Sequence, residues 1–126
     1  MKKKILVIDD DQTFRELISS GVDKEQYEVS TAADGVQGLE QLEKSSPDLI
    51  LLDIMMPRMN GVEFLEKMQS QHADKKIPVI ITSNDSSLDT ISRGAEFGVR
   101  GYIVKSNESM KTIMASIERV FSETKK

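Results

Sequence analysis

Charged and hydroxyl side chains stand at the ends of four short apolar runs in this chain. They are Asp9 and Asp10, Asp53, Thr82 with Ser83, and Lys105. Neighbouring carboxylates repel one another, so such a group favours a bound cation or a nearby lysine. Oxygen ligands of this kind suit Mg²⁺, and a carboxylate beside Mg²⁺ can attack phosphorus while lysine and hydroxyl donors stabilise the phosphoryl oxygens. Together the residues indicate phosphoryl transfer, although any one of them alone is best interpreted as the polar end of a strand.

The apolar runs predict the strands that must bring these side chains together. Their bounds are Lys4–Asp9, Tyr27–Thr31, Asp48–Asp53, Ile77–Thr82 and Gly101–Lys105. Four of them are nearly continuous in Ile, Leu and Val, as is typical of parallel strands that are covered on both faces. The second run is more mixed, which favours a position nearer the edge of a sheet.

Segments of helical period separate these runs. Their apolar stripes are Phe14, Leu17, Ile18 and Val22; Val36, Leu39 and Leu42; Val62, Leu65 and Met68; Leu88, Ile91 and Ala95; and Met110, Ile113, Met114, Ile117 and Phe121. Capping-box spacing of Asp34 with Gln37, and of Asn60 with Glu63, predicts where two helices begin. Alternating strands and helices predict an α/β fold with a doubly wound parallel sheet. Such folds bind ligands beyond the carboxyl ends of their strands, where the polar residues stand.

Length and composition limit the function classes. The 126 residues have the size of one domain, 1–126, and their formal net charge of −4 argues against direct nucleic-acid binding. Cysteine is absent, which excludes disulfide and thiolate chemistry and fits a cytoplasmic protein. No apolar run is long enough to cross a membrane. The single histidine, His72, has no partner at metal-ligand spacing and is interpreted as a surface residue.

Five stretches resemble the receiver domain of two-component response regulators, the CheY-like superfamily, in its single-domain type. They are Ile5–Asp11, Pro47–Pro57, Asn60-Gly61, Ile77–Ser83 and Gly101–Lys105, in the family's order and spacing. The resemblance implies a (βα)5 flavodoxin-like fold whose five-stranded parallel sheet has the order 2-1-3-4-5. It also implies a phosphoprotein of phosphorelay signal transduction that catalyses only its own phosphorylation and dephosphorylation, and is not otherwise an enzyme.

The resemblance assigns the acceptor and the metal ligands residue by residue. Asp53 is implied to be the phosphoacceptor. Asp10 is expected to bind Mg²⁺ directly, together with Asp53 and the backbone carbonyl of Met55, while Asp9 holds the metal through water.

The same resemblance assigns the switch residues. Ser83 matches the switch hydroxyl, Lys105 the lysine that pairs with phosphate, and Tyr102 the aromatic residue whose ring turns inward on activation. An ordinary half-buried tyrosine is the alternative for Tyr102. The fourth helix is expected to move, because Gly94 interrupts its thin apolar stripe, with close packing at Gly94 as the alternative.

The chain departs from the family pattern around the expected site. Most receivers have proline after the lysine, usually with a cis peptide bond, whereas this chain has Ser106. A trans Lys105–Ser106 bond is expected, since cis is costly before other residues, and Ser106 is a candidate cap for the last helix. Asn84 replaces a usually small residue and is expected either to crowd the phosphoryl site or to slow the access of water. Asp85 lies where receivers tune hydrolysis, or else begins the fourth helix.

The resemblance implies partners of two kinds. A sensor histidine kinase or a histidine phosphotransfer protein would supply the phosphoryl group. A downstream protein would bind the face formed by the fourth helix, fifth strand and fifth helix.

Two other functions compete with this interpretation. A degenerate receiver would act as a protein-binding module without phosphorylation. A haloacid-dehalogenase-type phosphatase would use Asp9 as nucleophile and Asp11 as general acid. The second option leaves Asp53 unused and lacks a later acidic pair, so Asp11 is better interpreted as the start of the first helix.

Overall fold

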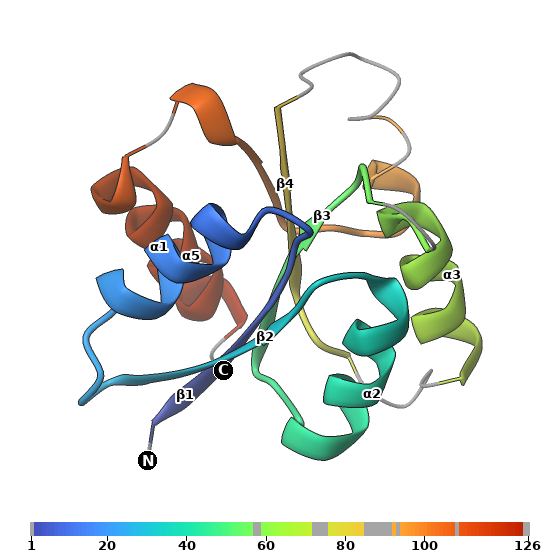
Figure 1. Cartoon of the computed structure of the whole chain (residues 1–126), viewed down its shortest axis with the longest axis horizontal. Coiled ribbons are helices and arrows are strands. Elements are labelled where there is room, and N and C mark those ends of the chain that lie inside the picture. The colour runs from blue at the N-terminus through green and yellow to red at the C-terminus, as the bar shows by residue number, and fades with distance from the viewer. Residues whose placement is uncertain are drawn as a thin grey trace.

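A computed structural model describes residues 2–56, 59–71, 76–84, 92, 94–107 and 109–124. Its strands are β1 (Lys3–Ile8), β2 (Tyr27–Ala32), β3 (Leu49–Asp53), β4 (Val79–Ser83) and β5 (Gly101–Val104). They form one parallel sheet in the order β2-β1-β3-β4-β5 (Figure 1). This is the predicted fold and strand order.

Every strand differs from its predicted bounds by one or two residues at one or both ends, and two of these shifts have a clear local reason. β4 begins at Val79 rather than Ile77, because Pro78 has no amide hydrogen for the ladder; its carbonyl still accepts the Ile50 amide at 3.0 Å. β5 ends at Val104, and Lys105 begins a short 3₁₀ turn, η1 (Lys105–Asn107). Lys105 therefore lies just beyond the strand rather than within it.

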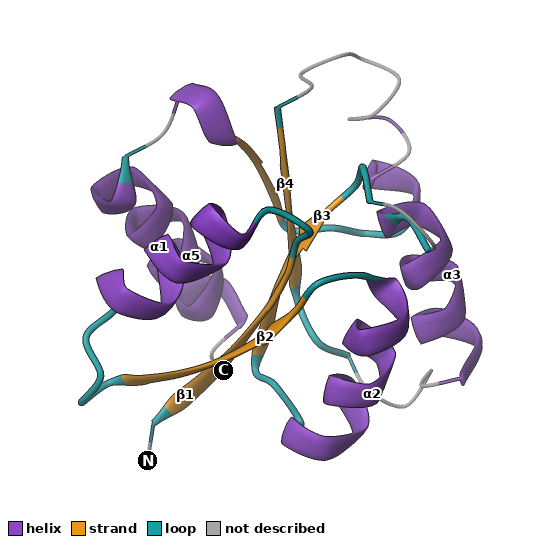
Figure 2. Ribbon diagram, in the orientation of Figure 1, coloured by secondary structure: helices purple, strands orange, loops and turns teal. Residues whose placement is uncertain are grey.

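Helices cover both faces of the sheet, as Figure 2 shows. α1 (Gln12–Gly21) and α5 (Met110–Thr124) pack on one face, whereas α2 (Gly35–Ser45) and α3 (Gly61–Gln71) pack on the other. None of the helices in the described ranges is long and apolar enough to cross a membrane.

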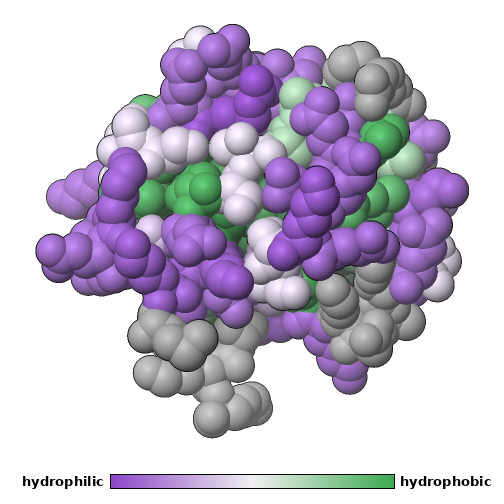
Figure 3. All heavy atoms as spheres, turned by 60° about the horizontal axis from the view of Figure 1, so that its bottom comes forward, coloured by the Kyte–Doolittle hydropathy of each residue, from purple (hydrophilic) through white to green (hydrophobic). Residues whose placement is uncertain are grey.

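The sheet separates two hydrophobic cores. One lies under α1 and α5 and contains Phe14, Ile113 and Ile117; the other lies under α2 and α3 and contains Leu42 and Phe64. Figure 3 turns the bottom of Figure 1 toward the viewer, and there small apolar patches lie among mostly polar residues.

Two residues of the predicted apolar stripes differ from expectation. Leu17 is 41% exposed and Val36 is 38% exposed. Both lie at the margin of their stripe, whose buried members include Ile18 in α1 and Leu42 in α2.

Side-chain caps start the helices. Asn60 and Glu63 form the predicted capping box, in which each side chain accepts the backbone amide of the other residue. The backbone amide of Gln37 donates to the Asp34 carboxylate at 2.9 Å. The prediction that Ser106 caps the last helix is wrong. Ser106 lies inside η1, and the Ser109 hydroxyl accepts the Thr112 amide instead, because α5 begins only at Met110.

The predicted fourth helix falls mostly outside the described residues, including Leu88, Ile91 and Asp85; His72 and Pro57 also lie outside them. Gly94 is described and helical. A Cβ atom on Gly94 would lie 2.5 Å from Cδ1 of Ile81. Close packing is therefore a sufficient reason for glycine here, and the expected motion stays a prediction.

Candidate functional site

Three carboxylates meet at the carboxyl ends of neighbouring strands. β1 pairs directly with β3, so Asp9, which follows β1, comes beside Asp53, the last residue of β3. Each of Asp9, Asp10 and Asp53 offers an oxygen, and these three oxygens lie within 4.8 Å of one another. Asp9 and Asp53 are buried, whereas Asp10 is exposed. The cluster thus has a buried floor and one carboxylate that faces solvent.

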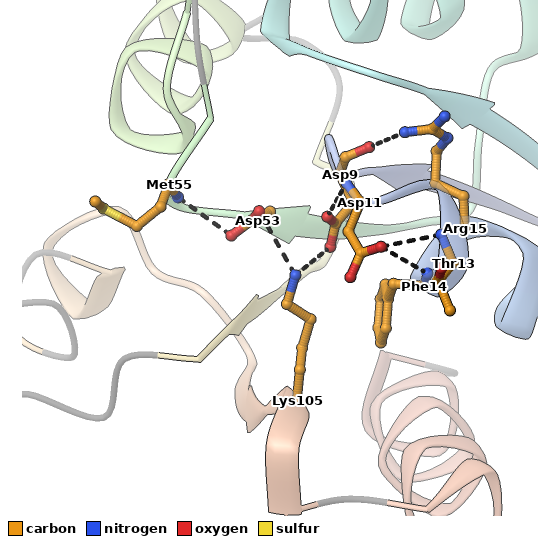
Figure 4. Close-up of polar contacts among 8 residues, drawn as sticks. All are labelled: Asp9, Asp11, Thr13, Phe14, Arg15, Asp53, Met55 and Lys105. Carbon is orange, nitrogen blue, oxygen red and sulfur yellow. Dashed lines mark hydrogen bonds and ion pairs between the residues drawn. The ribbon is translucent and has the colours of Figure 1, made fainter.

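Lys105 bridges the two buried carboxylates. Its Nζ lies 2.9 Å from Oδ2 of Asp9 and 3.6 Å from Oδ2 of Asp53, and its side chain is 9% exposed. Figure 4 shows the lysine extending from η1 with its ammonium between them. The Lys105–Ser106 peptide bond is trans, as predicted. The missing proline therefore does not keep the lysine out of the cluster.

Backbone groups hold the carboxylates in place. The Asp11 amide donates to Oδ1 of Asp9 at 2.9 Å, and the Met55 amide donates to Oδ1 of Asp53 at 3.2 Å. Arg15 donates from Nη1 to the carbonyl of Asp9 at 2.6 Å (Figure 4). The Arg15 contact was missed from the sequence, because an arginine on a helix carries no signal of its partner.

Asp11 begins α1, as predicted. Its carboxylate accepts the amides of Thr13 at 2.9 Å and Phe14 at 3.4 Å. The same residue lies at the rim of a pocket over the cluster. That pocket is lined by Asp10, Asp11, Asp53, Met55, Ser83, Asn84 and Lys105.

Burial and charge shift the acidity of the cluster. Burial, together with the neighbouring Asp9 charge, raises the pKa of Asp53 to about 7, although Lys105 and the Met55 amide oppose this. Burial also raises the pKa of Asp9, against the hydrogen bond from Lys105. For Lys105, burial lowers the pKa, but the Asp9 hydrogen bond and the carboxylate charges outweigh it and raise the pKa. Lys105 therefore keeps its proton readily, whereas the buried carboxyls of Asp9 and Asp53 are difficult to ionise at the same time.

The donor set fits a hard divalent cation. Asp9, Asp10 and Asp53 supply only oxygen, and one ammonium does not neutralise three carboxylates. Mg²⁺ binds through one or two carboxylates and keeps several waters, which suits a cluster with one solvent-facing member. Asp10 is the side chain best placed to meet an entering ion.

Most of the sequence-predicted site residues come together. Asp9, Asp10, Asp53 and Lys105 form the cluster, and Met55 and Ser83 line the pocket. Tyr102 is half-buried on β5 and does not line the pocket. Thr82 is fully buried, and among the described residues its hydroxyl has no hydrogen-bond partner.

Phe14 is a second residue that was missed at the site. It was predicted only as a core residue of the first helix. Its ring centroid lies 5.1 Å from Nζ of Lys105. A phenylalanine in an amphipathic helix is indistinguishable by pattern from any other core residue, so the sequence held no signal for this contact.

Comparison with protein families and curated relatives agrees with this geometry. The family model described as the response regulator receiver domain matches residues 5–118. The chain is 38% identical over 105 residues to sporulation initiation phosphotransferase F of Bacillus subtilis, covering 83% of each protein. It is 35% identical to the alkaline phosphatase synthesis transcriptional regulatory protein PhoP of Bacillus subtilis, but spans only 43% of that relative's length.

Solved structures show the same architecture. The chemotaxis protein CheY4 of Vibrio cholerae superposes with a TM-score of 0.87 at 31% identity, covering 95% of this chain and 99% of that one. A CheY-like receiver domain protein of Methanospirillum hungatei gives a TM-score of 0.87 at 28% identity, with 98% and 96% coverage.

Proposed function

This chain belongs to the response regulator receiver family, and from that premise we propose that Asp53 accepts a phosphoryl group and thereby switches the conformation of the domain. The observation that carries the proposal is the Asp9–Lys105–Asp53 cluster, in which Nζ of Lys105 lies 2.9 Å from Asp9 and 3.6 Å from Asp53, and of which Asp53 and Lys105 line the pocket. It combines a nucleophile, a cation and metal ligands at the edge where α/β folds bind ligands.

The reaction we propose is transfer from a phosphohistidine of a sensor kinase or a phosphotransfer protein. An oxygen of the Asp53 carboxylate attacks phosphorus, a new O–P bond forms, and the N–P bond to the donor histidine breaks. The chain then catalyses changes only at its own aspartate and is not an enzyme toward other substrates.

Acidity supports the need for cations in this step. With a pKa of about 7, a large fraction of Asp53 is protonated near neutral pH and is then a poor nucleophile. Asp9, Asp10, Asp53 and the Met55 carbonyl would hold Mg²⁺. Mg²⁺ supplies positive charge to the carboxylates and the phosphoryl oxygens when bound.

Lys105 and Ser83 would stabilise the product. Nζ of Lys105 already lies 3.6 Å from the acceptor, and Ser83, at the end of β4, lines the same pocket. Each hydrogen bond to a charged group contributes about 1.5–3 kcal/mol. Two such bonds would supply much of the roughly 5.5 kcal/mol needed to invert a two-state equilibrium. Tyr102 and the face of β5 and α5, with the fourth helix, would then signal to a downstream protein.

The test is phosphorylation by acetyl phosphate, measured by intact mass, with and without Mg²⁺. The wild type should gain one phosphoryl group only with Mg²⁺, and Asp53→Asn should gain none. Asp23→Asn, an exposed acid in the loop before β2, is the matched control and should be labelled like the wild type. If neither acetyl phosphate nor a histidine-phosphorylated donor labels the wild type, the proposal fails and the phosphorylation-independent binding module takes its place.

A further inference from the structure

Among the described residues, three from separate segments of the chain lie close to the Lys105 ammonium. Asp9 follows β1, Asp53 ends β3, and the Phe14 ring belongs to the first turn of α1. Figure 4 shows the Phe14 ring beside the upper part of the lysine. The two carboxylates and the aromatic ring thus enclose the ammonium from different directions.

These neighbours differ in what happens to them during the proposed reaction. Both carboxylates are metal ligands in the proposed function, and Asp53 also becomes esterified. Their hold on Lys105 therefore changes when an ion or a phosphoryl group enters. The ring of Phe14 is uncharged and only 6% exposed, so its contact is independent of both events.

The surroundings make this aromatic contact effective. The electron-rich face of an aromatic ring attracts an ammonium, and the attraction grows when water is excluded. The Lys105 side chain is 9% exposed, and the Nζ-to-centroid distance of 5.1 Å is within the range of such contacts. The backbone of that turn is capped by Asp11, which accepts the Phe14 amide at 3.4 Å, and the ring itself is buried in the hydrophobic core under α1 and α5.

The backbone at Lys105 is a short turn rather than part of a strand or an α-helix. Lys105 begins a three-residue 3₁₀ turn, and its peptide bond to Ser106 is trans. Four side-chain torsions separate its backbone from its ammonium, so contacts at the tip contribute to the position of the ammonium.

We propose that Phe14 is a positioning residue that keeps the Lys105 ammonium aimed at the acceptor when the carboxylates exchange it for a metal ion. This rests on the proposed function, because it assumes that Lys105 acts on the phosphoryl group of Asp53. Phe14 touches neither the phosphoryl group nor the acceptor in this role; it acts only through Lys105.

The experiment compares Phe14→Leu and Phe14→Tyr with Phe64→Leu. Phe64 is fully buried in the core on the opposite face of the sheet, so the same substitution there tests packing alone. One measurement, with Mg²⁺ present, is the rate at which an amine-acetylating reagent labels Lys105, from peptide mass spectrometry. The other is the rate constant for phosphorylation at saturating acetyl phosphate.

Phe14→Leu should make Lys105 about fivefold more reactive and phosphorylation about fivefold slower, whereas Phe14→Tyr, which keeps a ring, should remain near wild type. Phe64→Leu should lower the melting temperature and leave both rates unchanged. The proposal is overturned if Phe14→Leu leaves both rates at the wild-type value, or if Phe64→Leu changes them as much.

A ring-preserving variant guards against loss of folding. Replacing Phe14 with trifluorophenylalanine keeps the shape but weakens the negative charge of the ring face, so Lys105 should again be labelled faster. A wild-type labelling rate in that protein overturns the proposal. A change in Lys105 labelling without any phosphorylation of the wild type would support the contact and reject the proposed function. If the wild type is phosphorylated but the Phe14 variants keep wild-type labelling and phosphorylation rates, the proposed function is supported and the role of Phe14 is rejected.

Discussion

The Lys105 ammonium lies closer to Asp9, at 2.9 Å, than to Asp53, at 3.6 Å. Without a metal ion, the lysine therefore acts as the counter-charge of the carboxylate that is completely buried. This arrangement makes Lys105 part of the stability of the fold as well as of the proposed chemistry. It also means that a metal ion entering the cluster competes with the Lys105 ammonium for the carboxylates of Asp9 and Asp53.

Replacing Lys105 with methionine should destabilise the metal-free protein. Removing one partner of a buried ion pair leaves a buried charge uncompensated, which typically costs about 3–5 kcal/mol. We expect the free energy of unfolding at pH 7.5, measured with urea in the presence of a chelator, to fall by about 3 kcal/mol. Lys111→Met, which alters an exposed lysine of α5, is the control and should have little effect. Equal losses in the two variants would contradict a structural role for the Lys105 ion pair.

The stability of the metal-free protein should decrease as pH rises from about 4 to about 7. Burial and the Asp9 charge raise the pKa of Asp53 from 3.8 to about 7, so the folded state binds this proton more tightly than the unfolded state. The stabilising contribution is complete below the unfolded value and is lost as pH passes through the folded one. We expect a total loss on the order of 2–4 kcal/mol.

Asp53→Asn removes this titration and should flatten the curve between pH 4 and 7, measured by urea unfolding with a chelator. Asp9 also has a raised pKa, so a smaller slope of the same sign should remain. Asp23→Asn should retain the full slope. A wild-type slope in Asp53→Asn would show that the pKa of Asp53 is not raised in the fold.

Mg²⁺ should stabilise the folded protein. A ligand that binds only the native state adds about 2.7 kcal/mol at a concentration 100 times its Kd. We expect the melting temperature to rise with Mg²⁺ but not with KCl of equal ionic strength. Asp10→Asn should fold normally, since Asp10 is exposed, yet lose most of this rise. An undiminished rise in Asp10→Asn would exclude Asp10 as a ligand.

Gly61→Ala should disturb the backbone at the end of β3, where Asp53 lies. A Cβ atom at position 61 would lie 2.7 Å from the carbonyl oxygen of Asp53 and 2.7 Å from Cα of Ile54, and backbone atoms cannot rotate away. We expect a loss of about 1–3 kcal/mol in the free energy of unfolding, together with slower phosphorylation. At Gly101 the nearest atom is the mobile end of Arg119, at 3.2 Å, so Gly101→Ala should be tolerated. If the two variants behave alike, the close approach at Gly61 has no special effect.

Much of the fold was predictable because its causes are local. The nearly continuous Ile, Leu and Val runs of β1, β3 and β4 identify strands that are buried on both faces. Caps such as Asn60 with Glu63 require only neighbours a few residues apart. The prediction that Ser106 caps the last helix was wrong because a capping residue in the sequence does not show whether the helix begins at once or after a short turn. Here η1 comes first, and α5 begins only at Met110.

The sequence by itself determined which chemical groups reach the site, because the carboxyl ends of parallel strands meet at one edge and Asp9, Asp53, Ser83 and Lys105 stand at or just beyond such ends. Only the tertiary structure decided how these groups pair. The choice of Asp9 as the closest partner of Lys105, and the placement of the Phe14 ring against the ammonium, depend on how α1 and η1 pack over the sheet. Residues 14 and 105 are far apart in the chain, and no local pattern encodes the distance between their side chains.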